Sequence, residues 1–365
     1  MIQMNPEDSI LLLDILAVLQ KHTDEEHGVE QKDIINILER EYGYENLKRR
    51  RLTVKRNLER LINYHELRSL NDIEIEKTNY RREKDLITGE VNEVAVYSGF
   101  VYKHTFTHEE LHLIIDSILF SKQIPDFHKK ELIEKLEKLT SKHFNSRLSR
   151  VHTLSNNKPI NKQLFYTIKE LDQAISEKKK VSFYYNQYVI DEKSKLTLQQ
   201  RTDDKGNARQ YIINPYELVA ANGHYYVICN NDKYDNLSHY RVDRISNIHI
   251  SDEKRRPVND FKGFTYGLDL AKYMREHIYM FAGDIVGVRM RFNKRVLGEF
   301  VDWFGTEEIL FSDQTEDEVT VSVRVNRTAM RKWALQYGIY VRVLSPNDLV
   351  ADIKRDIQQV LENYE

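Results

Sequence analysis

The segment YYVIC, residues 225–229, followed closely by HYRVDRI, residues 239–245, decides most of what this sequence predicts. Both runs alternate mainly apolar residues with polar ones, which is the pattern of strands that bury one face of a sheet. The alternation places Tyr226, Arg241 and Asp243 on the polar side. We therefore expect a sheet that presents an anion-binding surface.

Arg244 breaks the alternation of the second run. Strict alternation would turn its side chain into the core, so a place beside Arg241 requires that the strand ends or bulges there. Two guanidiniums beside tyrosines could hold a phosphate and stack a base, which favours a nucleotide or a single-stranded nucleic acid as ligand. The candidate ligand-binding residues are Tyr184, Arg209, Tyr226, His239, Arg241, Asp243 and Arg244, of which Arg209 and His239 are the weaker ones.

A structural interpretation of the same residues stays open. Arg241 and Asp243 could form an ion pair that only ties two strands together, with Tyr226 simply half buried. For Asp243 the structural role and the ligand role are equally open, because a carboxylate can orient a neighbouring guanidinium in either case.

A second cationic element lies upstream, in KRRRLTVKRNLERL, residues 48–61. Between residues 44 and 63 there is a local excess of five positive charges. The net charge of -2 for the whole chain does not exclude a polyanionic partner, because salt screens charges beyond about 8–10 Å. Projection as a helix places Leu47, Val54, Leu58 and Leu61 on one side, and Arg49, Thr53, Arg56 and Arg60 on the opposite side.

This helix is a candidate for DNA recognition. Arginine can make bidentate contacts to guanine or phosphate, whereas lysine suits phosphate positioning. A solvated cationic face is the alternative, but two apolar helical stripes precede the helix and a strand-like hairpin with a long polar tip follows it, which indicates a winged helix-turn-helix. The candidate DNA-binding residues are Lys48, Arg49, Arg50, Thr53, Lys55, Arg56, Arg60, Arg81 and Arg82.

Length and composition indicate a folded protein with several domains. The chain has 365 residues, of which 41% are hydrophobic and 31% charged. The single Cys229 excludes an intrachain disulfide and fits a reducing cytoplasm. The longest apolar stretch near the start, residues 10–19, contains Asp14 and is shorter than the ~20 residues of a membrane span. We expect a core helix there and no membrane association.

The run HEELH, residues 108–112, matches the zinc-binding pattern HExxH. On a helix His108 and His112 would share a face, Glu109 could polarise a zinc-bound water, and Glu131 or Glu134 could be a third ligand. However, Thr107 and Glu110 form a predicted capping box, which puts His108 in the first turn, where the helix dipole disfavours positive charge. We therefore expect neither a metal nor a cofactor, and no enzymatic activity; a zinc metallopeptidase is the minor alternative.

The run GHYYVIC followed by SHYRVDRI closely resembles the signature of WYL domains, with Tyr225 in place of the tryptophan and Val227 in place of the leucine. The upstream runs VSFYY, residues 181–185, and NPYELV, residues 214–219, match the strands expected before it. FTHEELHLIIDSILFSK and GIYVRVLSPNDLVADI resemble the helical connector and the C-terminal extension of WYL-domain transcriptional regulators of bacteria. The resemblance covers nearly the whole chain.

The resemblance implies a multidomain α+β protein with an Sm-like or SH3-like β-barrel, effector sensing by the basic face of the barrel, and usually a homodimer. We expect a winged helix-turn-helix over residues 1–105, a helical connector over 106–158, a WYL domain over 159–255, and an α/β extension (WCX) over 256–365. The expected partners are double-stranded DNA and a nucleotide or single-stranded nucleic acid effector. An RNA- or single-strand-binding adaptor, in which the barrel is the principal binder, is the alternative.

Overall fold

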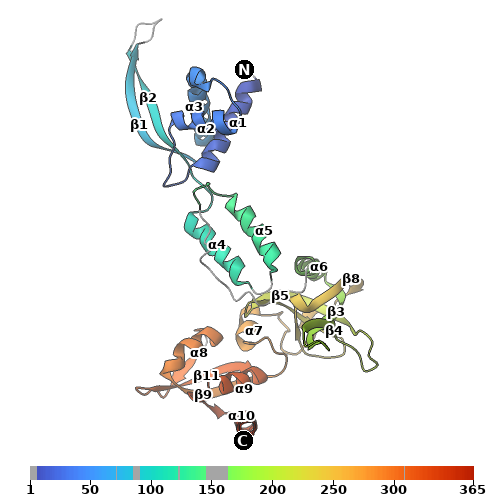
Figure 1. The fold of residues 1–365 in the computed structure, drawn as a ribbon. Helices are drawn as coiled ribbons and strands as arrows, with labels where there is room; N and C mark the ends of the chain where they lie inside the picture. The colour runs from blue at the N-terminus through green and yellow to red at the C-terminus, as the bar shows by residue number, and fades with distance from the viewer. Residues whose placement is uncertain (1–5, 71, 85–90, 122–123, 145–162, 308) are drawn as a thin grey trace. The chain divides into compact units, whose positions relative to one another are not determined.

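The computed structural model divides the chain into two compact units, residues 1–158 and residues 159–365 (Figure 1). The structure describes residues 6–70, 72–84, 91–121, 124–144, 163–307 and 309–365, without the side chains at 6–9, 80–84 and 91–96. Among these residues, no helix combines the length and the apolar character that crossing a bilayer requires.

The first unit contains helices and one antiparallel hairpin. Apolar residues of the first helices and of the hairpin base share a buried core, which includes Ile15, Leu38, Leu58 and Phe100. The element order is the one that the winged helix-turn-helix prediction requires. The elements are α1 (Pro6–His22), α2 (Gln31–Glu41), η1 (Leu47–Arg50), α3 (Arg51–Leu67), β1 (Ile73–Lys84), β2 (Val91–Tyr102), α4 (His108–Phe120) and α5 (Asp126–Glu137).

The basic helix differs from the prediction at its start. We predicted a helix from Lys48, but the chain first forms the 3-10 turn η1 and becomes α-helical at Arg51. Asn46 precedes the turn in a left-handed conformation, with φ of 58°. Such tight turns are common at the start of α-helices, where the first N–H groups have no partner within the helix.

Helices α4 and α5 pack against each other in the first unit (Figure 1). Pro125 separates them, as predicted, and occupies the N-cap position of α5. Helix α4 begins with the predicted capping box: Thr107 Oγ1 accepts from the Glu110 N–H at 3.3 Å, and the Thr107 N–H donates to Glu110 Oε2 at 3.0 Å. Helix α4 therefore begins immediately after Thr107.

The second unit begins with a helix and a curled antiparallel sheet that forms a half-barrel. Strand order in the sheet is β4-β3-β5-β6-β7, and β8 pairs with β3. Phe183, Val227, Cys229 and Val242 are buried in its core. The elements are α6 (Leu164–Glu177), β3 (Lys179–Ile190), β4 (Leu196–Gln200), β5 (Gln210–Ala221), β6 (His224–Asn230), β7 (Ser238–Arg241), η3 (Val242–Arg244) and β8 (Ile245–Lys254).

Strand β5 joins two runs that the sequence predicts as separate strands. Its first part pairs with β3 and its second part pairs with β6, and a bulge lies between Pro215 and Glu217. Proline has no N–H group to donate to a ladder, so it occurs in strands at edges and bulges. The strand can therefore pass from one neighbour to the other without a loop.

The outer face of strands β5, β6 and β7 is covered by the following segment. Phe261, Tyr273 and Met280 pack there against Tyr216 and Ile228 in a second buried cluster. This segment contains η4 (Val258–Asp260) and α7 (Leu270–Glu276). Only part of the outer face of the half-barrel is therefore available to a ligand.

The C-terminal part has the order β-α-β-β-α-β with a final helix, as an α/β extension should. Its sheet has the order β10-β11-β9-β12. Trp333 is fully buried and Trp303 packs against the same core, so both belong to the core as expected. The elements are β9 (Ile285–Asn293), η5 (Lys294–Val296), α8 (Leu297–Phe304), β10 (Leu310–Ser312), β11 (Glu318–Asn326), α9 (Arg327–Gln336), β12 (Val341–Ser345) and α10 (Asn347–Glu362).

Candidate nucleic-acid interface and effector site

The apolar side of the basic helix is buried as the sequence predicts. Leu47, Val54, Leu58 and Leu61 are between 0% and 3% exposed and belong to the core of the first unit. Helix α3 packs on α1 and α2 through this side. The core therefore fixes which side of α3 faces solvent.

The cationic side of the same helix faces solvent. Arg56 and Arg60 are exposed, and the hydrogen bonds of their guanidinium groups to described residues are long, at 3.4 Å, to the Leu52 carbonyl and to Asn57. Such weak contacts at a surface contribute little to stability, so these groups can exchange them for a phosphate or a base edge. Of the other candidates, Lys48, Arg49 and Arg50 are exposed, and Thr53 and Lys55 are half-buried.

The two lysines of this surface have carboxylate neighbours. Lys48 Nζ lies 3.9 Å from Glu39, and Lys55 Nζ lies 3.5 Å from Glu59 one helical turn away. Exposed pairs of this kind contribute about 0–1 kcal/mol and are weakened by salt. Arg51, which the sequence-based candidates omitted, is also exposed.

The candidate residues of the hairpin are placed by backbone only. Arg81 lies opposite Val94 and Arg82 opposite Glu93 in the β1–β2 register. Their side chains lie outside the described part of the chain. Their proposed contact with DNA stays a prediction.

Arg241 and Asp243 form a bidentate ion pair where β7 ends. Arg241 Nε donates to Asp243 Oδ1 at 3.0 Å, and Nη2 donates to Oδ2 at 2.7 Å. Both side chains are largely buried. Burial by itself would lower the pKa of Arg241, but the hydrogen bonds to Asp243 outweigh burial and raise it. The pair holds the guanidinium in one orientation, which suits both the ligand role and the structural role.

Tyrosines and a histidine surround this ion pair. Tyr226 lies directly opposite Arg241 in the β6–β7 register, and burial raises the pKa of its phenol. The Tyr185 hydroxyl accepts from the Arg241 N–H at 3.2 Å. Arg241 Nη2 lies 3.0 Å from His224 Nδ1. The site therefore combines a fixed cation with aromatic rings, the combination that binds a phosphate and a base.

Arg244 leaves the strand in the way that its ligand role requires. Strand β7 ends at Arg241, and the 3-10 turn η3 carries the chain through Arg244 to β8. The guanidinium lies 5.4 Å from the centre of the Tyr188 ring. Its Nε atom is buried and has no hydrogen-bond partner among the residues that the structure describes. A buried donor without a partner is costly, so a ligand oxygen there would be favourable.

The remaining effector candidates, His239, Arg209 and Tyr184, have contacts of their own. His239 lies on the face of β7 that α7 covers, and its Nε2 is 2.8 Å from the Tyr273 hydroxyl. Burial, with a smaller contribution from His277, lowers the pKa of His239 to about 3, so this imidazole is neutral at neutral pH and could contact an anion only as a hydrogen-bond donor. Arg209 is exposed and lies over the ring of Tyr211 at 4.9 Å. Tyr184 is half-buried, on β3 between β5 and β8.

Sequence reasoning missed three residues near the candidate site. His224 contacts Arg241, Tyr188 stacks with Arg244, and the Arg201 guanidinium lies over the Tyr185 ring at 5.2 Å. Tyr188 could have been found, because it continues the alternation of VSFYYNQY in β3. Arg201 and His224 come into place through strand pairings that a single sequence does not reveal.

The HEELH run is placed at the start of α4. His108 Nε2 lies 3.7 Å from Asp24 Oδ2, and both His108 and His112 rings contact the Phe144 ring, with centroids 5.3 and 4.7 Å apart. Among the described residues, no group of three or more His, Cys, Asp or Glu could hold a metal ion. Glu131 and Glu134 are exposed on α5 and bond to lysines.

Family models match two parts of the chain: a WYL domain over residues 166–250 and a WCX domain over residues 284–361. A comparison with curated proteins finds no match. Similar solved structures include proteasome accessory factor B/C (PafBC) of Arthrobacter aurescens, at 13% identity and a TM-score of 0.26, covering 98% of this chain and 49% of that one. A CRISPR Cas-related protein is 10% identical, with a TM-score of 0.35, covering 77% of this chain and 68% of that one. The chain thus spans about half the length of the first of these structures.

Proposed function

The chain is a protein with a WYL domain followed by a WCX domain, and we propose that it is a bacterial, cytoplasmic transcriptional regulator. In this proposal its N-terminal unit is a winged helix-turn-helix that binds duplex DNA, and its WYL domain binds an anionic, nucleotide-like effector. The carrying observation is the exposed arginine side of α3, opposite its buried apolar side. A helix with this division can pack on a core and enter a major groove at the same time.

The effector proposal rests on Arg241 and Arg244. A guanidinium held by Asp243 beside Tyr226, together with a second guanidinium that has a buried unpartnered Nε, offers directed donors and aromatic surface. Bidentate donors suit phosphate oxygens, and tyrosine rings suit bases. A nucleotide or a short single-stranded nucleic acid fits both requirements.

A homodimer is part of the same proposal. Helix α10 carries an apolar side that begins buried at Leu349 and Ile353 and continues as exposed Ile357 and Leu361. An exposed apolar extension of a core helix is typical of a protein interface. A twofold dimer would place two recognition helices about 34 Å apart on a palindromic operator.

The first test compares duplex and single-stranded DNA. We expect the full chain to bind a random-sequence duplex with an affinity that falls as salt rises. If the protein bound only the single strand, and the duplex not at all, the alternative of a single-strand-binding adaptor would be favoured. Sequencing of DNA fragments selected by the protein would then define the operator.

Replacing Arg244 with alanine should weaken binding of a short single-stranded oligonucleotide about 10-fold or more, because a charge-assisted hydrogen bond contributes roughly 1.5–3 kcal/mol. Fluorescence anisotropy would measure this in a chain that also carries Arg56→Ala and Arg60→Ala, so that the duplex-binding surface does not contribute.

Arg289→Ala is the control, because Arg289 is another arginine of the second unit and pairs with Asp313 at 2.5 Å. Equal oligonucleotide affinity of the Arg244 and Arg289 variants would remove Arg244 from the effector site. The duplex affinity of Arg244→Ala in an otherwise unchanged chain should equal that of the unmodified protein.

A further inference from the structure

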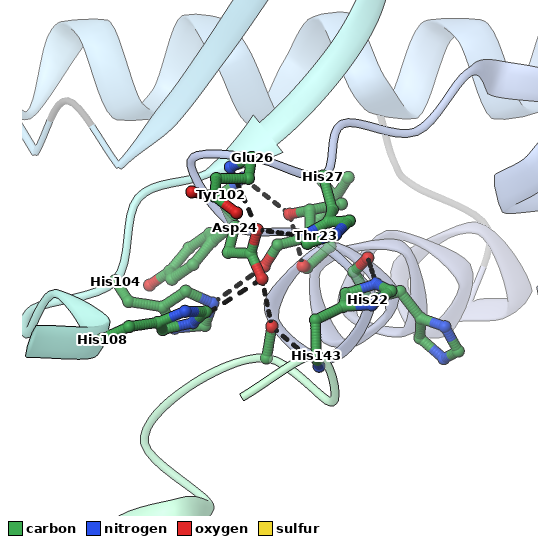
Figure 2. A network of polar contacts seen from close by, with 11 residues as sticks. His22, Thr23, Asp24, Glu26, His27, Tyr102, His104, His108 and His143 are labelled. Atoms are coloured by element: carbon green, nitrogen blue, oxygen red, sulfur yellow. Dashed lines mark hydrogen bonds and ion pairs between the residues drawn. The ribbon is translucent and has the colours of Figure 1, made fainter. Parts of the chain in front are cut away.

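The turn between α1 and α2 meets two other parts of the first unit, the start of α4 and the segment that follows α5. Figure 2 shows the polar contacts of this junction, with Asp24 at its centre. The Lys142 N–H donates to the Lys21 carbonyl at 2.8 Å, and His143 Nε2 lies 3.2 Å from the His22 carbonyl. The three-helix part and the α4–α5 part are therefore joined at this turn by backbone contacts as well as side chains.

Asp24 is a carboxylate buried at this junction, only 4% exposed. Its Oδ1 accepts from the Glu26 N–H at 3.1 Å and lies 2.6 Å from His27 Nδ1. Its Oδ2 accepts from the Ser141 hydroxyl at 2.5 Å. Burial raises the pKa of a carboxyl group, but the hydrogen bonds from Ser141 and His27 outweigh burial here and lower the pKa of Asp24. The buried group is thus an anion that depends on its donors.

The donors to Asp24 come from both sides of the junction. Glu26 and His27 belong to the same turn as Asp24, whereas Ser141 follows α5. The His27 ring also stacks on His143, with centroids 4.1 Å apart and planes 9° apart. A charge that stays buried but loses one of its hydrogen-bond donors keeps the cost of desolvation and loses part of the hydrogen bonding that offsets this cost. Removal of the Ser141 hydroxyl would therefore leave this carboxylate buried with fewer donors.

The junction around Asp24 touches the elements that hold the recognition helix and the hairpin in place. Helix α1, which ends at His22 just before the turn, packs on α3. The hairpin is joined to the same turn, because the Tyr102 N–H donates to Thr23 Oγ1 at 2.8 Å. The turn therefore touches α1, the hairpin and the α4–α5 part.

We propose that Asp24 is a positioning residue that fastens the recognition helix and hairpin to the α4–α5 connector through Ser141. A rearrangement of the connector is then passed to the DNA-binding surface as a rigid movement, because the carboxylate holds the two parts in one arrangement. The consequence for DNA rests on the proposed function. The contact itself is independent of it.

Hydrogen exchange of the full chain tests the contact without DNA. Ser141→Ala and Asp24→Asn should each raise the exchange rates of the Lys142 and Tyr102 amides about 10-fold, since each removes a charge-assisted hydrogen bond. The effects of the two changes on exchange should be less than additive in the double variant, because both changes remove the hydrogen bond between Ser141 and Asp24. Ser141→Thr, which keeps the hydroxyl, should restore the slow exchange.

Ser117→Ala is the matched control. The Ser117 hydroxyl donates only within α4, to the Leu113 carbonyl at 2.8 Å, so its removal should leave the Lys142 and Tyr102 amides unchanged. Additive effects of the two junction variants, or exchange as slow as in the unmodified chain, would overturn the proposal. If Asp24→Asn fails to fold, the comparison of Ser141→Ala with Ser141→Thr still tests the contact.

Duplex binding separates this proposal from the proposed function. Ser141→Ala should keep the basal affinity for a random-sequence duplex but lose most of the change that a short single-stranded oligonucleotide causes in it. If the oligonucleotide changed the duplex affinity of Ser141→Ala as much as that of the unmodified protein, Asp24 and Ser141 would be excluded as the connection, even if the amides of the variant exchanged faster. Failure of the unmodified protein to bind duplex DNA would instead contradict the proposed function, and hydrogen exchange would still decide the contact.

Discussion

Replacing Arg56 and Arg60 together with alanine is expected to lower the affinity of the full chain for a random-sequence duplex about 100-fold at low salt. The estimate takes roughly 1–3 kcal/mol for each arginine that contacts DNA. The slope of log affinity against log salt should also become shallower by about two, because each lost phosphate contact contributes ~0.9 to it. Titration at several salt concentrations measures both quantities.

The fold should survive this double change. Both side chains are exposed and make only long hydrogen bonds, and such surface substitutions usually alter stability by less than about 0.5 kcal/mol. A matched control replaces Lys130 and Lys135, exposed on α5 of the same unit, and should leave the affinity nearly unchanged. If both double variants bind alike, α3 is not the recognition helix.

The division of α3 was predictable because it is a local property. Helical geometry alone places Val54, Leu58 and Leu61 on one side, and a buried core needs such a side. The 3-10 start of the helix was not predicted, because it depends on the left-handed backbone of Asn46. The arginine side is therefore the best-founded part of the DNA-binding proposal.

Only the residues of the effector site that lie on neighbouring strands could be predicted from the sequence. Arg241, Asp243 and Tyr226 come together because two neighbouring strands with a short connection must pair in register. The direction of His239 could not be predicted, since the tyrosine that it meets, Tyr273, lies on a helix of the following segment. Alternation gives the face of a strand but not what covers that face.

The histidines of the first unit show the same limit. The sequence pattern HEELH matches a zinc motif that the predicted capping box argued against, and the contact that the structure gives His108, with the buried carboxylate of Asp24, was not among the alternatives. Asp24 itself carried no signal in the sequence, because its partner Ser141 is 117 positions away. Contacts of this kind follow from the packing of distant segments and require a structure.

Acidification is expected to destabilise the half-barrel of the second unit through His239. The folded state lowers the pKa of this imidazole to about 3, whereas an unfolded chain has the ordinary value near 6.5. The unfolded state therefore binds the proton first, so the stability is fully present above pH 6.5 and is lost as the pH falls toward 3. The loss is about 1.4 kcal/mol for each pH unit below 6.5.

The loss of stability at low pH can be measured at Cys229, the single cysteine of the chain. Cys229 is fully buried in the core of the half-barrel, so a thiol reagent such as a dipyridyl disulfide reacts with it only after the half-barrel opens. The ratio of its reaction rates in the folded and the denaturant-unfolded chain gives the opening free energy at each pH. This ratio cancels the pH dependence of the reagent itself.

His239→Gln should make the pH dependence of opening shallower by one proton, because glutamine keeps a polar partner for the Tyr273 hydroxyl but does not titrate. Burial also lowers the pKa of His277, and hydrogen bonds lower the pKa of Asp232, so the remaining slope should keep the same sign. His249→Gln is the matched control, since His249 is an exposed histidine on β8. An unchanged slope in His239→Gln would mean that the imidazole is protonated without opening the fold, and His239 would then be a cationic effector candidate on the same strand as Arg241.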